Sequence, residues 1–154
     1  MMNAARQFLS IFKLRIGVVI TLSALAGLAV APGPAPTVWQ VVVLAFAVLV
    51  SAASSGAFNQ YAERDLDGHM SRTRDRPFVT GEARPGMLWL TVIWGLLAVS
   101  VLAAAWAINV WVALYVFLGA FTYAVIYTVW LKRRTWLNIV FGGLSGSFAG
   151  MAGA

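Results

Sequence analysis

The sequence predicts an all-α membrane protein, a polytopic transmembrane helical bundle with about five spans. Of its 154 residues, 61% are hydrophobic and only 10% are charged, whereas a soluble domain carries roughly 25% charged residues. The hydrophobic residues form runs close to the roughly 20 residues that an α-helix needs to cross a hydrocarbon core. Because backbone polar groups inside a bilayer must be satisfied within the segment, these runs are expected to be helices and not strands.

Five apolar segments follow one another along the chain. They cover about residues 14–31, 37–61, 87–108, 110–131 and from about 136 to the last residue given. Short uncharged turns, rich in proline or centred on an asparagine, join the first segment to the second and the third to the fourth. Residues 1–154 are therefore expected to form a single membrane domain.

The charged residues predict the orientation of this domain. All 11 Lys and Arg residues lie before or at the very start of the first segment, between the second and third, or after the fourth. They thus share one side of the membrane, which the positive-inside rule makes the cytoplasmic side. The N-terminus and the acidic loop are expected in the cytoplasm, with a bacterial inner membrane as the location.

The same distribution excludes two other classes of function. A net charge of +6 could suggest nucleic-acid binding, but the charges flank hydrophobic spans and form no long basic run. The chain contains no cysteine, which excludes disulfides and thiolate metal sites. Small residues are concentrated at 51–57 and at Gly142, Gly146 and Gly150, and we interpret both groups as faces for close helix packing.

Polar chemistry is concentrated where the second segment reaches the cytoplasm. All five acidic residues lie between Glu63 and Glu82, and carboxylates are costly enough near a bilayer to indicate a functional site. Asn59, Glu63 and Asp67 recur at four-residue intervals, which places three oxygen ligands on one helix face. Such a set suits Mg²⁺, which proteins usually hold through one or two carboxylates together with substrate phosphates and water.

Basic residues in the same region suit a substrate with a diphosphate group. Arg72 and Arg76 are four residues apart and could bind phosphate oxygens in bidentate fashion. Lys132 and Arg133, which follow the fourth segment, could extend the same positive rim. The spacing alone fits equally well with a solvated loop whose Arg–Asp pairs stabilise the topology, and the basic pair after the fourth segment is more typical of a topology signal.

At these positions the sequence resembles the UbiA-type intramembrane prenyltransferases. The first acidic motif of that family is similar to Asn59-x-x-x-Glu63-x-Asp65-x-Asp67 followed by Met70-x-Arg72-Thr73-x-x-Arg76-Pro77. The second part of this motif, together with the block from Tyr127 to Gly146, resembles the protoheme IX farnesyltransferase (haem O synthase) branch. The segment Phe12-Lys13-Leu14-Arg15-Ile16 is similar to the opening of that branch.

The resemblance implies a Mg²⁺-dependent enzyme that transfers a farnesyl group from farnesyl diphosphate to the vinyl group of haem b, giving haem O. Haem b would then be a substrate and not a cofactor. The implied metal ligands are Asn59, Glu63 and Asp67. The implied catalytic residues are Glu63, Asp67 and Arg72. The implied substrate-binding residues are Asn59, Arg72, Arg76, Lys132 and Arg133.

The chain also departs from the family pattern. Leu14 and Trp136 stand where the family has proline, and Phe148-Ala149 replace prolines expected after Gly146. The second acidic motif of the family is absent from these residues, so we expect the N-terminal portion of a longer enzyme, whether a fragment, a frameshifted product or a natural half-protein. Whether this chain is active by itself stays open. The alternatives are a UbiA-type transferase with an aromatic or chlorin acceptor, and a non-catalytic membrane fragment. The sequence does not predict an oligomeric state.

Overall fold

The structure is a computed structural model that describes residues 4–132, 134 and 137–154. Within these ranges it contains helices and no strand, which confirms the predicted all-α fold. The helices are α1 (Ala4–Ile11), α2 (Leu14–Val30), α3 (Val38–Ala62), α4 (Arg64–Asp67), α5 (Pro77–Thr80), α6 (Met87–Ala107), α7 (Val110–Phe121), the π-helix η1 (Thr122–Leu131) and α8 (Asn138–Gly153). The π-helix continues α7 directly.

The long helices match the five predicted apolar segments, with bounds within two residues of those expected. Three helical stretches among the described residues are long and apolar enough to cross a membrane, namely 38–62, 87–107 and 110–131. The helix α2 is a shorter apolar helix of 17 residues, and α8 has 16. These helices indicate an integral membrane protein.

Local sequence signals set the helix ends. Thr37 and Gln40 form a capping box at the start of α3, which satisfies backbone amides that the first helical turn leaves free. The Asn109 side chain accepts a hydrogen bond of 2.8 Å from the Val112 amide and begins α7. Pro77 begins α5, and Gly81, at φ +80°, follows its last residue in the left-handed region that glycine tolerates best.

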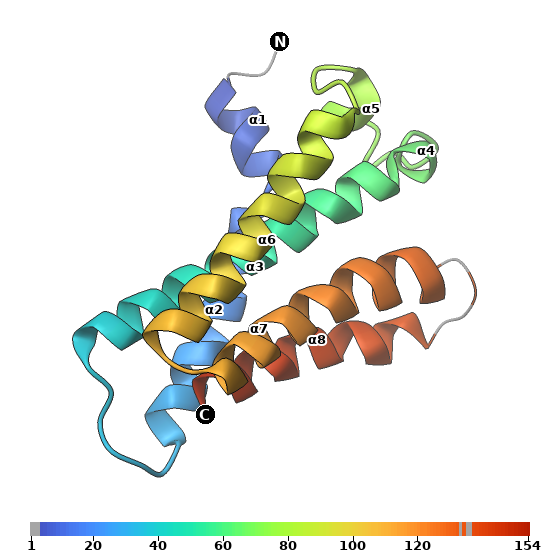
Figure 1. Cartoon of the computed structure of the whole chain (residues 1–154). Coiled ribbons are helices and arrows are strands. Elements are labelled where there is room, and N and C mark those ends of the chain that lie inside the picture. Colours follow the sequence, from blue (N-terminus) through green and yellow to red (C-terminus); the bar gives the residue numbers. More distant parts are fainter. Residues whose placement is uncertain (1–3, 133, 135–136) are drawn as a thin grey trace.

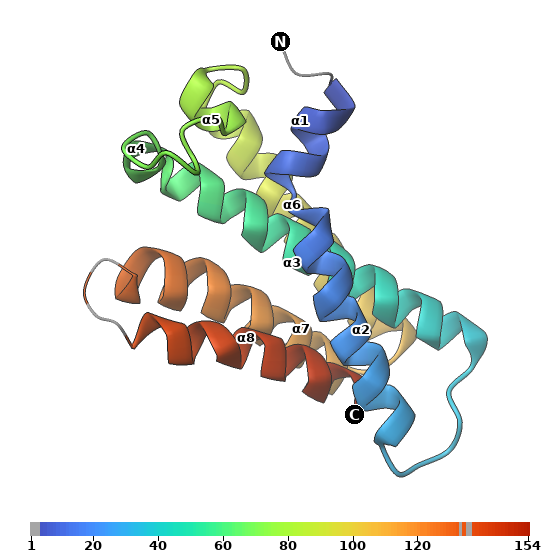
Figure 2. The ribbon, with the colours of Figure 1, turned by 180° about the vertical axis from the view of Figure 1, so that it is seen from behind.

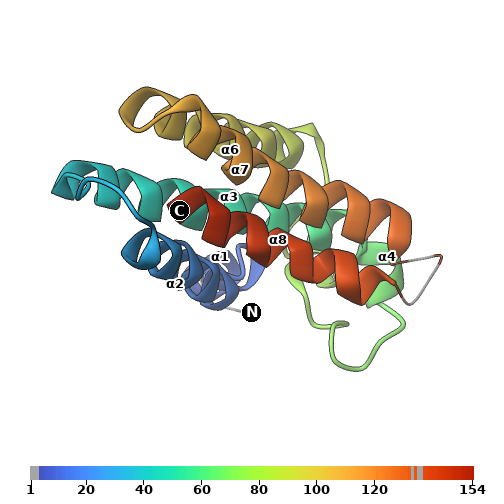
Figure 3. The same ribbon diagram turned by 90° about the horizontal axis from the view of Figure 1, so that it is seen from below.

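Contacts between neighbouring helices close the five long helices into a ring. Figure 1 shows two of these pairs, with α6 along α3 and α7 along α8. In this ring α2 packs against α3, α3 against α6, α6 against α7, and α7 against α8, which returns to α2. Figure 3 shows α3 between α2 on one side and the pair α6 and α7 on the other. The helix α3 also contacts α7 and η1, so its polar end faces the π-helix.

Glycines form the seam between α2 and α8. A Cβ atom at Gly27 would overlap the carbonyl oxygen of Gly150, and a Cβ atom at Gly153 would overlap that of Ala24. This is the close packing expected for small residues in membrane helices. The partner of α8 at this seam is the first span, since α8 meets α3 at only a few residues.

The two ends of the bundle differ in character (Figure 2). One end carries α1, α4, α5 and the last turn of η1, and with them the charged segments. The other end carries the turns between α2 and α3 and between α6 and α7, together with the C-terminal end of α8. The structure therefore gathers the polar chemistry at one end, which we call the polar end.

Candidate functional site

The predicted stripe of oxygen ligands is buried at the polar end. Asn59, Glu63 and Asp67 are only 2%, 1% and 3% exposed. The helix α3 ends at Ala62, yet the Glu63 amide donates to the Asn59 carbonyl at 3.1 Å and the Asp67 amide to the Glu63 carbonyl at 2.8 Å. Because these bonds keep the i to i+4 pattern of an α-helix, the three side chains stay on one face across the junction with α4.

Each member of the stripe contacts a basic side chain from a different part of the chain. The pairs are Lys13 with Asn59, Lys132 with Glu63, and Arg76 with Asp67. The two ion pairs measure 2.7 Å from Lys132 Nζ to Glu63 Oε2 and 2.5 Å from Arg76 Nη1 to Asp67 Oδ2. Charge-assisted hydrogen bonds of this kind are short and strong, so three cations hold the buried oxygens in place.

The loop after α4 folds back over the stripe. The Thr73 hydroxyl donates to the Asp67 carbonyl at 3.0 Å, and the Arg76 amide donates to the Thr73 carbonyl at 3.1 Å. These bonds bring Arg76 to Asp67 across nine positions of sequence. Arg72 is exposed and lies on the rim of the neighbouring cavity.

A polar cavity of about 600 Å³ lies beside the stripe. Its lining includes four basic side chains, one carboxylate, the two tyrosines of η1 and two side-chain amides, as follows: Lys13, Arg72, Arg76, Lys132, Asp75, Tyr123, Tyr127, Asn59 and Gln60. Positive charge around a roomy cavity suits an anionic group such as a phosphate.

Two buried acceptor atoms near this cavity lack a partner. In the described part of the chain, Glu63 Oε1 and Gln60 Oε1 are buried without a hydrogen bond. An unsatisfied buried carboxylate oxygen is costly, and such an atom indicates a ligand. Two carboxylates and an amide are a donor set that Mg²⁺ accepts when a substrate supplies further oxygens. The described residues contain no cluster of three His, Cys, Asp or Glu side chains that would hold a metal by themselves.

Lys13 is a site residue that the sequence interpretation did not assign. It lies in the left-handed region at φ 46°, which is uncommon outside glycine, and directly precedes α2 as its N-cap residue. Gln60 fixes this junction by donating to the carbonyls of Ser10 and Ile11. Burial, reinforced by the nearby Arg76, lowers the pKa of Lys13 to about 8. A lysine just before an apolar run is also a plain topology signal, so its position in the sequence does not reveal this role.

The π-helix shapes the wall opposite the stripe. The Thr128 hydroxyl of this helix donates to the Tyr123 carbonyl, five residues earlier, at 2.8 Å. The same hydroxyl accepts a hydrogen bond of 3.2 Å from Asn59 Nδ2 on the stripe. The rings of Tyr123 and Tyr127 stack at 5.2 Å, and Lys132 Nζ lies 5.7 Å from the Tyr127 ring centroid. π-helical segments are rare in proteins, and where they occur they are often part of a functional site.

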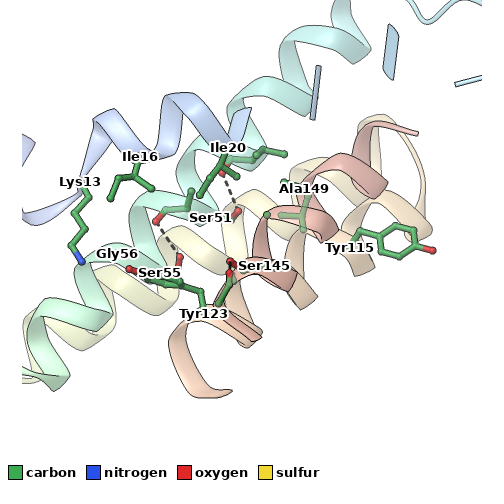
Figure 4. A pocket seen from close by; sticks show the side chains of 18 residues that line it. Lys13, Ile16, Ile20, Ser51, Ser55, Gly56, Tyr115, Tyr123, Ser145 and Ala149 are labelled. Carbon is green, nitrogen blue, oxygen red and sulfur yellow. Dashed lines mark hydrogen bonds between the residues drawn. The ribbon is translucent and has the colours of Figure 1, made fainter. Parts of the chain in front are cut away.

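An apolar cavity of about 270 Å³ continues from the polar cavity into the bundle (Figure 4). The two cavities share Lys13, Ile16 and Tyr123. Small residues of α3 and α8 leave much of this space, namely Ser51, Ala52, Ser55, Gly56, Gly142, Gly143, Ser145, Gly146 and Ala149. The interpretation of the small-residue runs as packing faces is thus incomplete, because several of these residues line a cavity.

The structure brings together five of the seven residues proposed from the sequence. Glu63 pairs with Lys132 and Asp67 with Arg76. Asn59 lies on the same helix face and contacts Lys13 and Thr128. Arg72 lines the cavity beside them, and Arg133 lies outside the described residues. His69 is exposed and its ring nitrogen Nδ1 lies 2.9 Å from the Asp65 carbonyl oxygen, away from the stripe contacts.

A sequence model of the UbiA prenyltransferase family matches residues 20–154. The chain is 57% identical over 145 residues to Protoheme IX farnesyltransferase 2 of Paramagnetospirillum magneticum, covering 94% of this chain and 50% of the relative. It is 43% identical over 150 residues to Protoheme IX farnesyltransferase 1 of the same organism, covering 97% and 52%. A Protoheme IX farnesyltransferase of Caldivirga maquilingensis is 40% identical over 151 residues, covering 96% and 52%. No solved structure matches.

Proposed function

The chain belongs to the UbiA prenyltransferase family, and from this premise we propose that it binds farnesyl diphosphate and contributes to transfer of the farnesyl group to the vinyl group of haem b, giving haem O. The chain spans about half the length of the curated relatives it matches. The relatives are named for this reaction, so the activity of the whole protein is inferred from them.

The observation that carries the proposal is the junction of a cationic cavity with an apolar one. A prenyl diphosphate has an anionic head and a long apolar tail, and it needs both environments in direct contact. The polar cavity supplies the cations Lys13, Arg76 and Lys132, and the adjoining cavity supplies apolar walls. Lys13 and Tyr123 lie at the boundary, where the first carbon of the prenyl chain would be placed.

We propose that Asn59, Glu63 and Asp67 hold Mg²⁺ while the diphosphate is bound. Glu63 Oε1, which is buried without a hydrogen bond, would be one of the atoms that bind the metal. When bound, Mg²⁺ would neutralise charge that develops on the diphosphate as the bond between carbon and oxygen breaks. The basic side chains now paired with the stripe lie within the same cavity, so they can turn their hydrogen bonds to phosphate oxygens. Positioned donors of this kind stabilise a leaving group without a covalent intermediate on the protein.

The apolar cavity has a separate task in this scheme. The electron pair of the broken bond leaves with the diphosphate, and an allylic cation remains at the first carbon of the farnesyl chain. The π electrons of the haem vinyl group then form the new bond to that carbon, which leaves the positive charge on the vinyl carbon next to the porphyrin ring. Water adds to this vinyl carbon and releases a proton, which gives the hydroxyl group of haem O. Walls that exclude water protect the cation from hydrolysis. The stacked tyrosines of η1 add ring faces near the boundary, where a cation is favourable.

The test is formation of haem O by the complete natural gene product in membranes. Haem b, farnesyl diphosphate and Mg²⁺ are supplied, and haem O is measured by chromatography and mass spectrometry. We expect haem O with Mg²⁺ and none after chelation. Prenylation of an aromatic or chlorin acceptor in place of haem b would show that a different member of the family is present, and absence of any prenyl transfer would refute the proposal.

We also propose that the polar end faces the cytoplasm of a bacterial cell, since the Lys and Arg residues of the sequence share one side of the spans. The chain has no cysteine, so single cysteines can report the orientation. In intact cells, an impermeant maleimide should label Ala35→Cys, in the turn after α2, and not Ser71→Cys, in the acidic loop. The reverse pattern would contradict the orientation.

A further inference from the structure

One tyrosine lies between two cavities of the bundle. Tyr115 of α7 lines the apolar cavity and also a second cavity of about 370 Å³ at the opposite end of the bundle. Among the described residues, Tyr115 alone belongs to both linings. Figure 4 shows Lys13 at one end of the apolar cavity and Tyr115 at the other, with its ring extending beyond the cavity.

The side chain of Tyr115 is partly buried and packs against the core of the bundle. Tyr115 packs against a cluster of buried side chains that includes Val48 of α3, Val116 of α7 and Ala149 of α8, and these three residues also line the apolar cavity. The cluster that supports Tyr115 thus draws side chains from α3, α7 and α8. A side chain packed against such a cluster resists displacement by a flexible prenyl tail.

The depth of the cavity follows from the helices that line it. On α3 the lining extends from Gly56 to Val48, and on α7 and η1 it extends from Tyr123 to Tyr115. Each stretch advances eight residues, which is about 12 Å at the α-helical rise of about 1.5 Å per residue. A prenyl diphosphate whose head group binds at Lys13 therefore has about 12 Å of cavity for its tail before the tail meets Tyr115.

We infer that Tyr115 determines the longest isoprenoid chain that the site accepts, an inference that rests on the proposed function. The side chain closes the apolar cavity against the second one, which is lined by Leu28, Leu44 and Val112 among others. Its removal would join two cavities of about 270 Å³ and 370 Å³. A longer tail would then continue into the second cavity in place of meeting a ring. Tyr115 is thus a specificity-determining residue and takes no part in breaking or forming bonds.

The test compares affinities for prenyl diphosphates of different length. The complete natural gene product is purified in detergent, and dissociation constants for geranyl, farnesyl and geranylgeranyl diphosphate are measured with Mg²⁺ present. We expect the wild type to bind the farnesyl compound about 10-fold or more tightly than the geranylgeranyl compound, because an overlong tail meets the Tyr115 side chain. Tyr115→Ala should remove this preference by improving affinity for the longer compound.

Matched variants separate a local effect from general damage. Leu114→Ala removes a large side chain from the neighbouring position, which is 40% exposed, and should keep the wild-type preference. Tyr115→Phe keeps the aromatic ring and should also keep the wild-type preference for the farnesyl compound. Tyr115→Leu is a milder truncation and should weaken this preference, as Tyr115→Ala does.

The outcomes distinguish this inference from the proposed function. If the wild type binds none of the three compounds, the proposed function fails. If it binds them but shows no limit on length, or if both truncations at Tyr115 leave the ratio of affinities unchanged, the role of Tyr115 is refuted while the proposed function stands. A gain for the longer tail in the truncations, with Leu114→Ala unchanged, supports the role.

Discussion

The polar end and the glycine seam hold the same bundle together by opposite means. At the polar end, basic side chains from three parts of the chain contact a buried stripe on α3 and α4. At the seam, the backbones of α2 and α8 approach so closely that a Cβ at Gly27 would overlap a carbonyl. Ionic contacts can exchange one partner for another, whereas backbone contacts cannot. We therefore expect changes at the polar end to alter ligand binding and changes at the seam to alter stability.

The largest effect is expected at Asp67. Asp67→Asn removes one of two buried charges proposed to hold the metal, and should lower prenyl transfer by about 100-fold or more. Membrane insertion and helix content should be retained, because the amide still fits the site. Asp65→Asn is the matched control, since Asp65 is exposed. Near-wild-type haem O formation by Asp67→Asn would refute the metal role of the stripe.

A change at the seam should give the opposite pattern. Gly27→Ala places a methyl group against the Gly150 carbonyl, and forced overlap in a packed interior costs about 1–3 kcal/mol. The thermal midpoint in detergent should fall, while the dissociation constant for farnesyl diphosphate in the remaining folded protein changes little. Gly95→Ala is the control, because a Cβ at Gly95 meets nothing within 4 Å. Equal midpoints for the two variants would show that the seam is looser than the structure indicates.

Lys13 should give the smallest of the three effects, and it tests both sides of the comparison. Lys13→Met removes the ammonium group that contacts Asn59 and lines the cavity, and should weaken binding of farnesyl diphosphate by about 10-fold, the loss of one charge-assisted hydrogen bond. Lys13→Gly removes the same group but relieves the left-handed backbone. It should show the same loss of affinity with higher stability than Lys13→Met. Wild-type affinity in both variants would exclude Lys13 from the diphosphate site.

The sequence predicted the helices well because membrane spans depend on the length and polarity of a segment and little on its neighbours. The stripe was predictable for a similar reason, since the spacing of Asn59, Glu63 and Asp67 translates directly into one helix face. The partners of the stripe were harder. Arg76 was assigned to the substrate and Lys132 to the positive rim, whereas the structure shows both bound to carboxylates. Such pairs span 9 and 69 positions of sequence, and spacing carries no information on them.

The amino-acid sequence by itself determined the fold class, the spans, the common side of the basic residues and the face shared by the acidic stripe, because each follows from local periodicity and composition. Only the tertiary structure decided that Lys13 contacts the stripe, that small residues of α3 and α8 line a cavity, and that Tyr115 lies between this cavity and a second one. A glycine or serine in a helix permits either close packing or open space. Which of the two results depends on the side chains that other helices place opposite it, and that arrangement exists only in the folded bundle.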